Sequence, residues 1–209
     1  MHRRLSTAAL ALVAPLVLAL GPTLAGAEPP AHGAQAQDPN PCVGPEAAAL
    51  RCPDLTMRRP WGLYTDRLTK PGHTVLRAGN SIDSIGAGPA ELFGTRIGKR
   101  WMRGRQRIER RDGGRIGVNT GARLQFKFAH LQRYWWKFYN AARFELFRVD
   151  AQGVKTTRVR VGPKVAYCLR DLEHTRPRLA HSPRWPFYPA CSNDPKREHV
   201  TLGTSIGWS

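Results

Sequence analysis

The sequence predicts an all-β protein, an antiparallel β-sandwich, and three observations carry that prediction. Apolar and polar residues alternate over short stretches, as at 124–128, 144–148 and 158–161. Turn residues, such as the Asp-Ala-Gln-Gly run at 150–153, separate these stretches. Long runs with a helical period are few. Period-two alternation bounded by turns is typical of half-buried strands, and short strands at this spacing favour a sandwich.

The remaining elements follow in chain order. A short helical turn is expected at 46–50, and strands are expected at 75–78 and 90–93 with a glycine-rich bend at 80–89 between them. The next stretch, 96–115, contains four glycines that break any helix, and we expect a basic, solvated excursion with a hairpin turn at Asp112-Gly113.

The segment 131–142 fits neither period cleanly. It gathers the aromatic residues Tyr134, Trp135, Trp136, Phe138 and Tyr139. Aromatic side chains dominate protein cores, and a core position is the plainer interpretation. The alternative is an exposed surface in which these rings, with Arg133 and Lys137 interleaved, stack on bases or sugars.

The first residues predict export. Residues 1–27 combine a basic start, an apolar run that is too short for a comfortable membrane span, and a small-residue cleavage pattern. Removing the two arginines of this signal lowers the net charge from +18 to +16. We expect residues 28–41 to be a flexible leader and residues 42–209 to form one domain. The mature chain is then secreted or held at the cell surface, with no membrane-spanning segment.

Four cysteines in an exported chain favour disulfides, and they allow three pairings. The two sequence-local clusters favour Cys42–Cys52 and Cys168–Cys191. Free cysteines are the alternative. Scattered histidines near the second cluster match no common zinc spacing.

The stretch 96–115 holds nine Lys or Arg residues and two acids. This basic surface could bind teichoic-type polymers or anionic lipid head groups. A solvated loop is the plainer interpretation, and no nucleic-acid-binding module accompanies the charge, so no specific nucleic-acid partner is expected. Its predicted members are Arg96, Lys99, Arg100, Arg103, Arg105, Arg107, Arg110 and Arg111.

Four pieces of the chain, in a fixed order, resemble one known family. They are Val75-Leu76-Arg77 with Asn80 and Gly86, then Arg143-Phe144-Glu145-Leu146, then the stretch from Lys164 to Asp171, and last Gly207-Trp208-Ser209. In this order and spacing they resemble the lysyl oxidase family in its bacterial exported form. The resemblance implies that family's antiparallel β-sandwich, and an ancestry among copper-dependent enzymes that oxidise primary amines such as peptidyl lysine.

The resemblance also implies which parts of that machinery this chain carries. The family holds copper with a His-x-His-x-His run, and the matching positions here are Gln132, Tyr134 and Trp136, none of which replaces imidazole. Lys164 matches the lysine of the family's lysine–tyrosine quinone. The partner tyrosine and the closing strands would lie beyond Ser209. The resemblance therefore implies a degenerate, C-terminally incomplete copy with no copper and no quinone.

We therefore expect an exported lysyl oxidase-like protein that is non-catalytic and keeps a binding role outside the cell. The first alternative is an active copper amine oxidase acting on extracellular protein lysines. The second is a cell-surface module that binds anionic polymers through its basic surface.

Overall fold

The computed structural model describes residues 36–129 and 133–209, and these ranges form an all-β, antiparallel structure. At this level the predicted fold class is confirmed. One 3-10 helix, η1 (Pro45–Ala49), lies where the helical turn was expected. The strands are β1 (Leu50–Arg51), β2 (Leu55–Met57), β3 (Trp61–Asp66), β4 (Val75–Gly79), β5 (Ile82–Ser84), β6 (Ala90–Gly98), β7 (Trp101–Arg110), β8 (Arg115–Val118), β9 (Arg123–Ala129), β10 (Arg133–Ala142), β11 (Glu145–Val149), β12 (Lys155–Val161), β13 (Val165–Tyr167) and β14 (His199–Thr204).

Some predictions fall outside the described residues. The export signal at 1–27 lies there, as do residues 28–35 of the leader and position 132. The described end of the leader is bonded to the loop between β8 and β9, because Asp38 N donates to Asn119 O (2.8 Å) and Asn119 N donates to Asp38 Oδ2 (2.7 Å). In the described part of the chain, no helix is long and apolar enough to cross a membrane.

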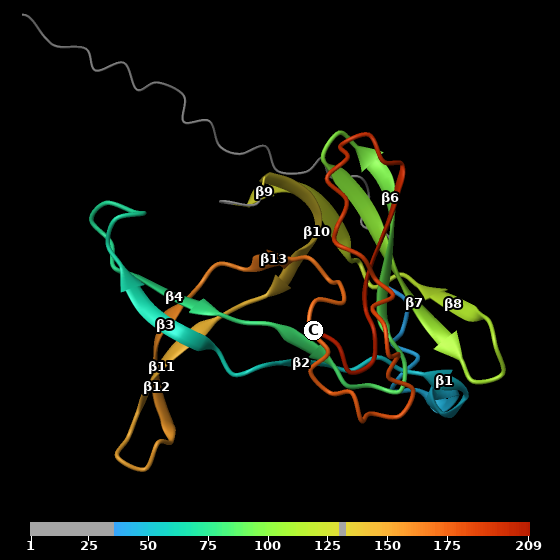
Figure 1. Cartoon of the computed structure of the whole chain (residues 1–209), viewed down its shortest axis with the longest axis horizontal. Helices are drawn as coiled ribbons and strands as arrows, with labels where there is room; N and C mark the ends of the chain where they lie inside the picture. Colours follow the sequence, from blue (N-terminus) through green and yellow to red (C-terminus); the bar gives the residue numbers. More distant parts are fainter. Residues whose placement is uncertain (1–35, 130–132) are drawn as a thin grey trace, which may run out of the picture. The chain divides into compact units, whose positions relative to one another are not determined.

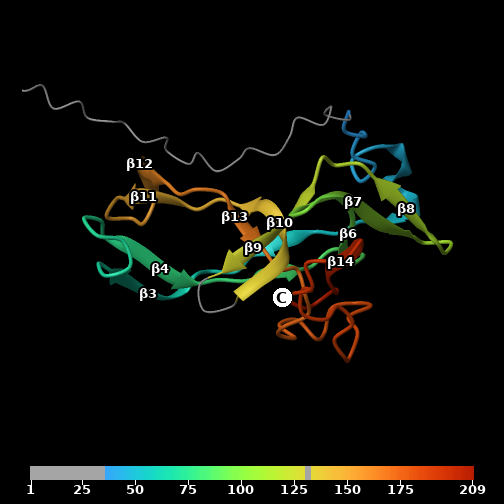
Figure 2. The same cartoon turned by 90° about the horizontal axis from the view of Figure 1, so that it is seen from above.

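The main sheet has the strand order β13-β10-β9-β7-β6-β14, and β1 and β8 also pair with β7 (Figure 1; β14 is labelled in Figure 2). Three further pairs of strands, β2–β5, β3–β4 and β11–β12, form separate two-stranded sheets. The long hairpin of β7 and β8 turns at residues 111–114, which confirms the hairpin predicted around Asp112-Gly113 (Figure 2).

The prediction that 96–115 is a solvated excursion is wrong, because most of this stretch is strand in the main sheet. Met102 and Ile108 of β7 are buried in two core clusters. Gly104 does not break the strand, and a Cβ at this position would meet Leu124 Cδ1 at 3.0 Å. Glycine here allows β7 and the Leu124 side chain to approach closely.

Register divides the main sheet into two faces. Met102 lies opposite Leu124, and Leu92 lies opposite both Gln106 and Leu202. Because side chains alternate along a strand, these residues share one side of the sheet, which we call the core face. Its buried cluster consists of Leu92, Met102, Leu124, Phe126, Trp136, Leu169, Cys191, Val200 and Leu202.

Residues 191–204 link two separated strands of this sheet. Trp136 N in β10 donates to Ser192 O (2.9 Å), and Arg96 N in β6 donates to Glu198 O (2.9 Å). The same segment then continues into β14, which pairs with β6 along its whole length. The segment therefore ties β10 to β6 at the core face.

Both predicted disulfides are present. Cys42–Cys52 closes a loop beside the small cluster of Leu50, Ile108 and Val118. Cys168–Cys191 joins the segment after β13 to the start of the linking segment, and Cys191 lies in the main core. A covalent bond between chain segments lowers the entropy of the unfolded chain, by about 3 kcal/mol for loops of this size.

Candidate anion-binding surface

Several cations lie on the side of the main sheet opposite the core face, and one of them, Arg107, is paired with Glu91. Arg103 and Arg105 in β7 point to this side, because Met102 and Gly104 point to the core. Arg123 lies opposite Arg103, and Lys137 and Trp101 both lie opposite Gln125. Lys127 falls on the same side as Gln125 by alternation. We call this set the cationic face: Arg103, Arg105, Arg123, Lys127 and Lys137.

The cationic face lacks acidic partners. None of its five residues forms an ion pair with an Asp or Glu of the described chain. Arg105 donates from Nη2 to Gly117 O (2.9 Å), and Arg103 lines a hollow of about 520 Å³ with Arg105 and Asp38. The Asp38 carboxylate accepts the backbone N–H of Asn119 within that hollow. Like charges directly opposite on neighbouring strands destabilise a sheet, so Arg103 and Arg123 contribute nothing favourable to folding as a pair.

Aromatic residues stand between these cations. Trp101 precedes Arg103 by two residues on the same side of β7, and its ring meets Tyr139 of β10 edge-on at 5.0 Å. Trp135 lies opposite Lys127. Interleaved cations and ring faces suit an anionic partner with planar or sugar-like parts.

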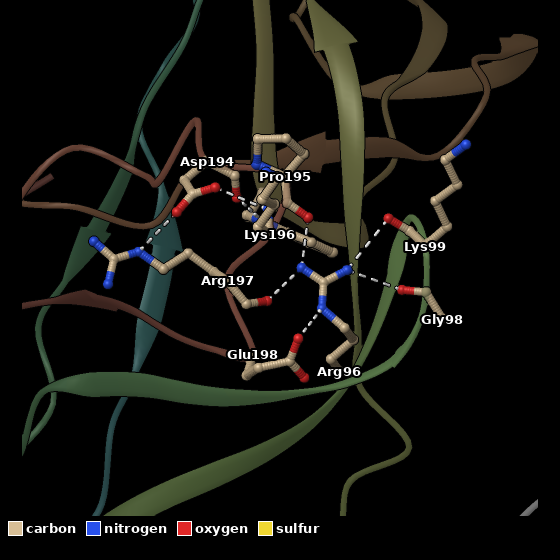
Figure 3. A network of polar contacts seen from close by, with 9 residues as sticks. Arg96, Gly98, Lys99, Asp194, Pro195, Lys196, Arg197 and Glu198 are labelled. Carbon is tan, nitrogen blue, oxygen red and sulfur yellow. Dashed lines mark hydrogen bonds and ion pairs between the residues drawn. The ribbon is translucent and has the colours of Figure 1, made fainter.

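Half of the predicted basic surface has a structural role instead. Arg96 is the best example: its guanidinium donates to Pro195 O and Arg197 O, to Gly98 O (3.2 Å) and to Lys99 O (3.4 Å) (Figure 3). It also stacks 5.3 Å from the ring centre of Trp136. Arg96 Nε lies 3.0 Å from Glu198 Oε1, which is an ion pair without the alignment of a hydrogen bond. We call this arrangement the Arg96 clamp.

Arg107 is also committed to the fold. Its guanidinium lies 3.2 Å from Oε1 of Glu91 and 3.7 Å from the ring centre of Phe93. The Glu91 carboxylate is buried, and it also pairs with Arg115 (3.4 Å) and accepts the Tyr188 hydroxyl (2.7 Å). Burial and this hydrogen bond raise the pKa of Tyr188 well above its ordinary value.

The other predicted basic residues divide in the same way. Arg100 Nε donates to Phe126 O (3.1 Å), and Arg110 pairs with Asp112 (3.0 Å), which raises the pKa of Arg110 through the hydrogen bond. Lys99 and Arg111 are exposed and pair with no acid of the described chain. The predicted surface is therefore not one site.

Of the three positions that match copper ligands, the structure describes Trp136 and Tyr134. Trp136 is fully buried (0% exposed), and its Nε1–H donates to Asp194 O (2.9 Å), so this ring offers no lone pair. Tyr134 is 44% exposed and stacks on Phe126. Gln132 lies outside the described residues. Within 36–129 and 133–209, no group of three His, Cys, Asp or Glu residues could hold a metal ion.

Lys164 is exposed and lines a cavity of about 640 Å³ together with Phe138, Tyr139 and Leu169. The Glu91 carboxylate also lines this cavity, and it is already paired with Arg107 and Arg115 and accepts the Tyr188 hydroxyl. No described interaction fixes the Lys164 amine in place.

The aromatic residues of β10 divide between the two predicted roles, according to the side of the strand on which they lie. Trp136 fills the core and Phe138 packs against it, whereas Tyr139 contacts Trp101 on the other side of the sheet. Two members of the cationic face, Arg123 and Lys127, were not among the predicted residues, and Lys137 was predicted only as a cation interleaved with the aromatic rings. The alternation of cations with apolar residues in β9 and β10 was the available signal.

Comparison of the chain with known proteins adds no family. No family model, no curated protein and no solved structure matches it. The lysyl oxidase resemblance therefore stays a prediction from the sequence.

Proposed function

We propose that this chain is an exported, non-catalytic protein of the lysyl oxidase type that binds an anionic polymer at or outside the cell surface. The proposal includes that family's β-sandwich fold. The antiparallel pairing of the strands is in keeping with such a fold. Two disulfides are in keeping with an oxidising compartment outside the cytosol. The observation that carries the binding role is the cationic face with its missing acidic partners.

A polymer suits this face better than a single small ion. Residues two apart along a strand are about 7 Å apart, and opposite residues on neighbouring strands are about 5 Å apart. Arg103, Arg105 and Arg123 thus form an array of charges rather than one convergent point. An extended chain that repeats negative groups could contact several of them at once and release counterions, and such binding weakens steeply with salt.

The non-catalytic part rests on the ligand positions. Trp136 fills the core with its indole N–H already donated to a carbonyl, so copper chemistry has no place at that position. In the family, copper is needed to oxidise the tyrosine that becomes part of the quinone. Without copper, the Lys164 amine has no oxidised tyrosine to react with.

Binding of the mature protein to polyphosphate and to polyglutamate, across a series of salt concentrations, tests the proposal. We expect the logarithm of the association constant to fall linearly with the logarithm of salt concentration. The double variant Arg103→Gln/Arg105→Gln should weaken binding at least about tenfold and lower the salt slope by about one to two. The matched control, Arg110→Gln/Arg111→Gln, removes the same charge from the hairpin turn and should bind within about twofold of wild type.

Two outcomes contradict the proposal in different places. Equal losses in the double variant and in its control would show that net charge, and not the cationic face, drives binding. One tightly bound copper per chain, with peroxide formed when a primary amine is added, would overturn the non-catalytic part.

A further inference from the structure

A cavity of about 580 Å³ lies between β10 and the segment that follows β13, beside the second disulfide. Its volume falls in the range of small-ligand sites. Arg133, Lys137 and Arg170 line it from two different chain segments, and Trp135 forms part of its wall. The cavity is therefore bounded by cations that the fold brings together over a long sequence distance.

Negative charge is missing from this cavity. No Asp or Glu is among its described lining residues. The nearest acid in sequence, Asp171, is occupied elsewhere, because its carboxylate accepts the backbone N–H groups of Phe187 (2.7 Å), Tyr188 (3.0 Å) and Ser205 (2.6 Å). Neither Lys137 nor Arg170 has an ion-pair partner in the described chain.

The pKa of Lys137 reflects the crowding of positive charge around this cavity. Burial lowers its pKa, and the positive charges of Lys127 and Arg170 lower it further. Three cations held near one another without a counter-charge cost free energy in the empty protein, and a bound anion would remove that cost. The fold gains nothing from the cluster itself.

We infer that this cavity is a binding site for a phosphate group, with Lys137 and Arg170 as the principal contacts and Lys127 as a further charge nearby. A doubly charged oxyanion balances more of this cluster than a single carboxylate does. The planar guanidinium of Arg170 can donate two hydrogen bonds to one phosphate, and the Lys137 ammonium acts as a point charge. Small apolar residues of the wall, Ala166 and Ala190, leave room for the carbon part of a phosphomonoester.

This site shares Lys137 with the cationic face, and in that respect it rests on the proposed function. It differs in its ligand, because a convergent cavity selects one phosphate group whereas the array around Arg103 selects a chain. The phosphate could belong to a small phosphomonoester or to the end of a polymer. Binding of inorganic phosphate, glycerol phosphate and a short polyphosphate to the same protein distinguishes these sources.

Calorimetry of the mature protein with inorganic phosphate, at constant ionic strength set by chloride, tests the inference. We expect one saturable site per chain, at least about tenfold weaker in Lys137→Met and in Arg170→Gln, and largely retained in Lys137→Arg. Lys99→Met is the matched control and should bind phosphate as wild type does. In protein with isotopically dimethylated lysines, the Lys137 resonance should titrate at a higher pH when phosphate saturates the site.

The two proposals fail separately. Arg103→Gln/Arg105→Gln should lose polymer binding and keep phosphate binding, so loss of both would point to a general charge effect. If phosphate binds no better than chloride, or if Lys137→Met leaves its affinity unchanged, the cavity site is overturned while polymer binding can stand. A Lys137 resonance that does not move with phosphate would overturn it as well.

Discussion

Arg96 and Arg103 belong to the same basic stretch of sequence, and the sheet uses them in opposite ways. Arg96 points to the core side of β6, where its guanidinium meets carbonyl oxygens, Glu198 and the ring of Trp136. Arg103 points to the other side of β7 and meets Arg123 across the strands. The first guanidinium bridges segments of the fold, whereas the second carries a charge that no acid of the described chain balances.

The number of cations in a stretch of sequence therefore says little about function. What matters is the side of the strand to which each cation points, and what the register places opposite. An arginine next to free carbonyl oxygens replaces lost water contacts and stabilises the segment it bridges. An arginine opposite another arginine stabilises nothing until an anion arrives.

The largest effect should come from breaking the Arg96 clamp. Arg96→Gln leaves the carbonyls of residues 195 and 197 without their charged donor and uncovers Trp136, and we expect a loss of about 3 kcal/mol in the free energy of unfolding. Chemical denaturation measures it. Lys99→Gln removes the same charge three residues away and should change stability by less than about 0.5 kcal/mol. Similar losses of unfolding free energy in both variants would contradict the conclusion that Arg96 stabilises the fold and Lys99 does not.

The strand pattern itself was predictable where one side of a strand is apolar. The alternation at 124–128 and 158–161 identified β9 and β12, since the side chains there differ clearly between the two sides. β7 was missed because its core side reads Met102, Gly104, Gln106 and Ile108, in which a glycine and an amide interrupt the apolar set. Gly104 is small because Leu124 occupies the space, and only the neighbouring strand reveals this.

The candidate site was less predictable than the fold. Arg123, Lys127 and Lys137 lie 20 or more residues beyond Arg103 in the sequence, and they join it through pairing of β7, β9 and β10. A single sequence does not show which strands pair with one another in the sheet. Arg107 was wrongly grouped with the exposed residues for the same reason, because its partner Glu91 belongs to β6. Cysteine pairing succeeded because close sequence spacing limits the choices.

A smaller effect separates two arginines on one side of one strand. Arg107→Gln takes a cation from the buried carboxylate of Glu91, although Arg115 and the Tyr188 hydroxyl remain, and we expect a loss of about 2 kcal/mol. Arg105→Gln, two residues earlier, removes one hydrogen bond to Gly117 O and relieves like-charge repulsion, and should stay within about 0.5 kcal/mol of wild type. Denaturant midpoints of the two variants give the answer. A larger loss for Arg105→Gln would mean that the cationic face is structural.

The smallest effect is a dependence on pH at Lys137. Burial lowers the pKa of Lys137 below its ordinary value of 10.5, and the positive charges of Lys127 and Arg170 lower it further. As pH rises through the lowered pKa, the folded state releases this proton before the unfolded state does, so the unfolding free energy increases until pH 10.5 is reached.

Lys137→Met removes both the cost at neutral pH and this rise. We therefore expect the variant to be at least as stable as wild type near pH 7, and the difference to shrink as pH approaches 10.5. Thermal unfolding of both proteins from pH 7 to 10.5 measures it, with Lys99→Met as the matched lysine substitution. Tyr167 and Tyr188, whose pKa values burial raises, titrate in both proteins and cancel in the difference. If Lys137→Met is less stable at neutral pH, the ammonium has a stabilising partner, and the cationic cluster would belong with the Arg96 clamp as part of the fold.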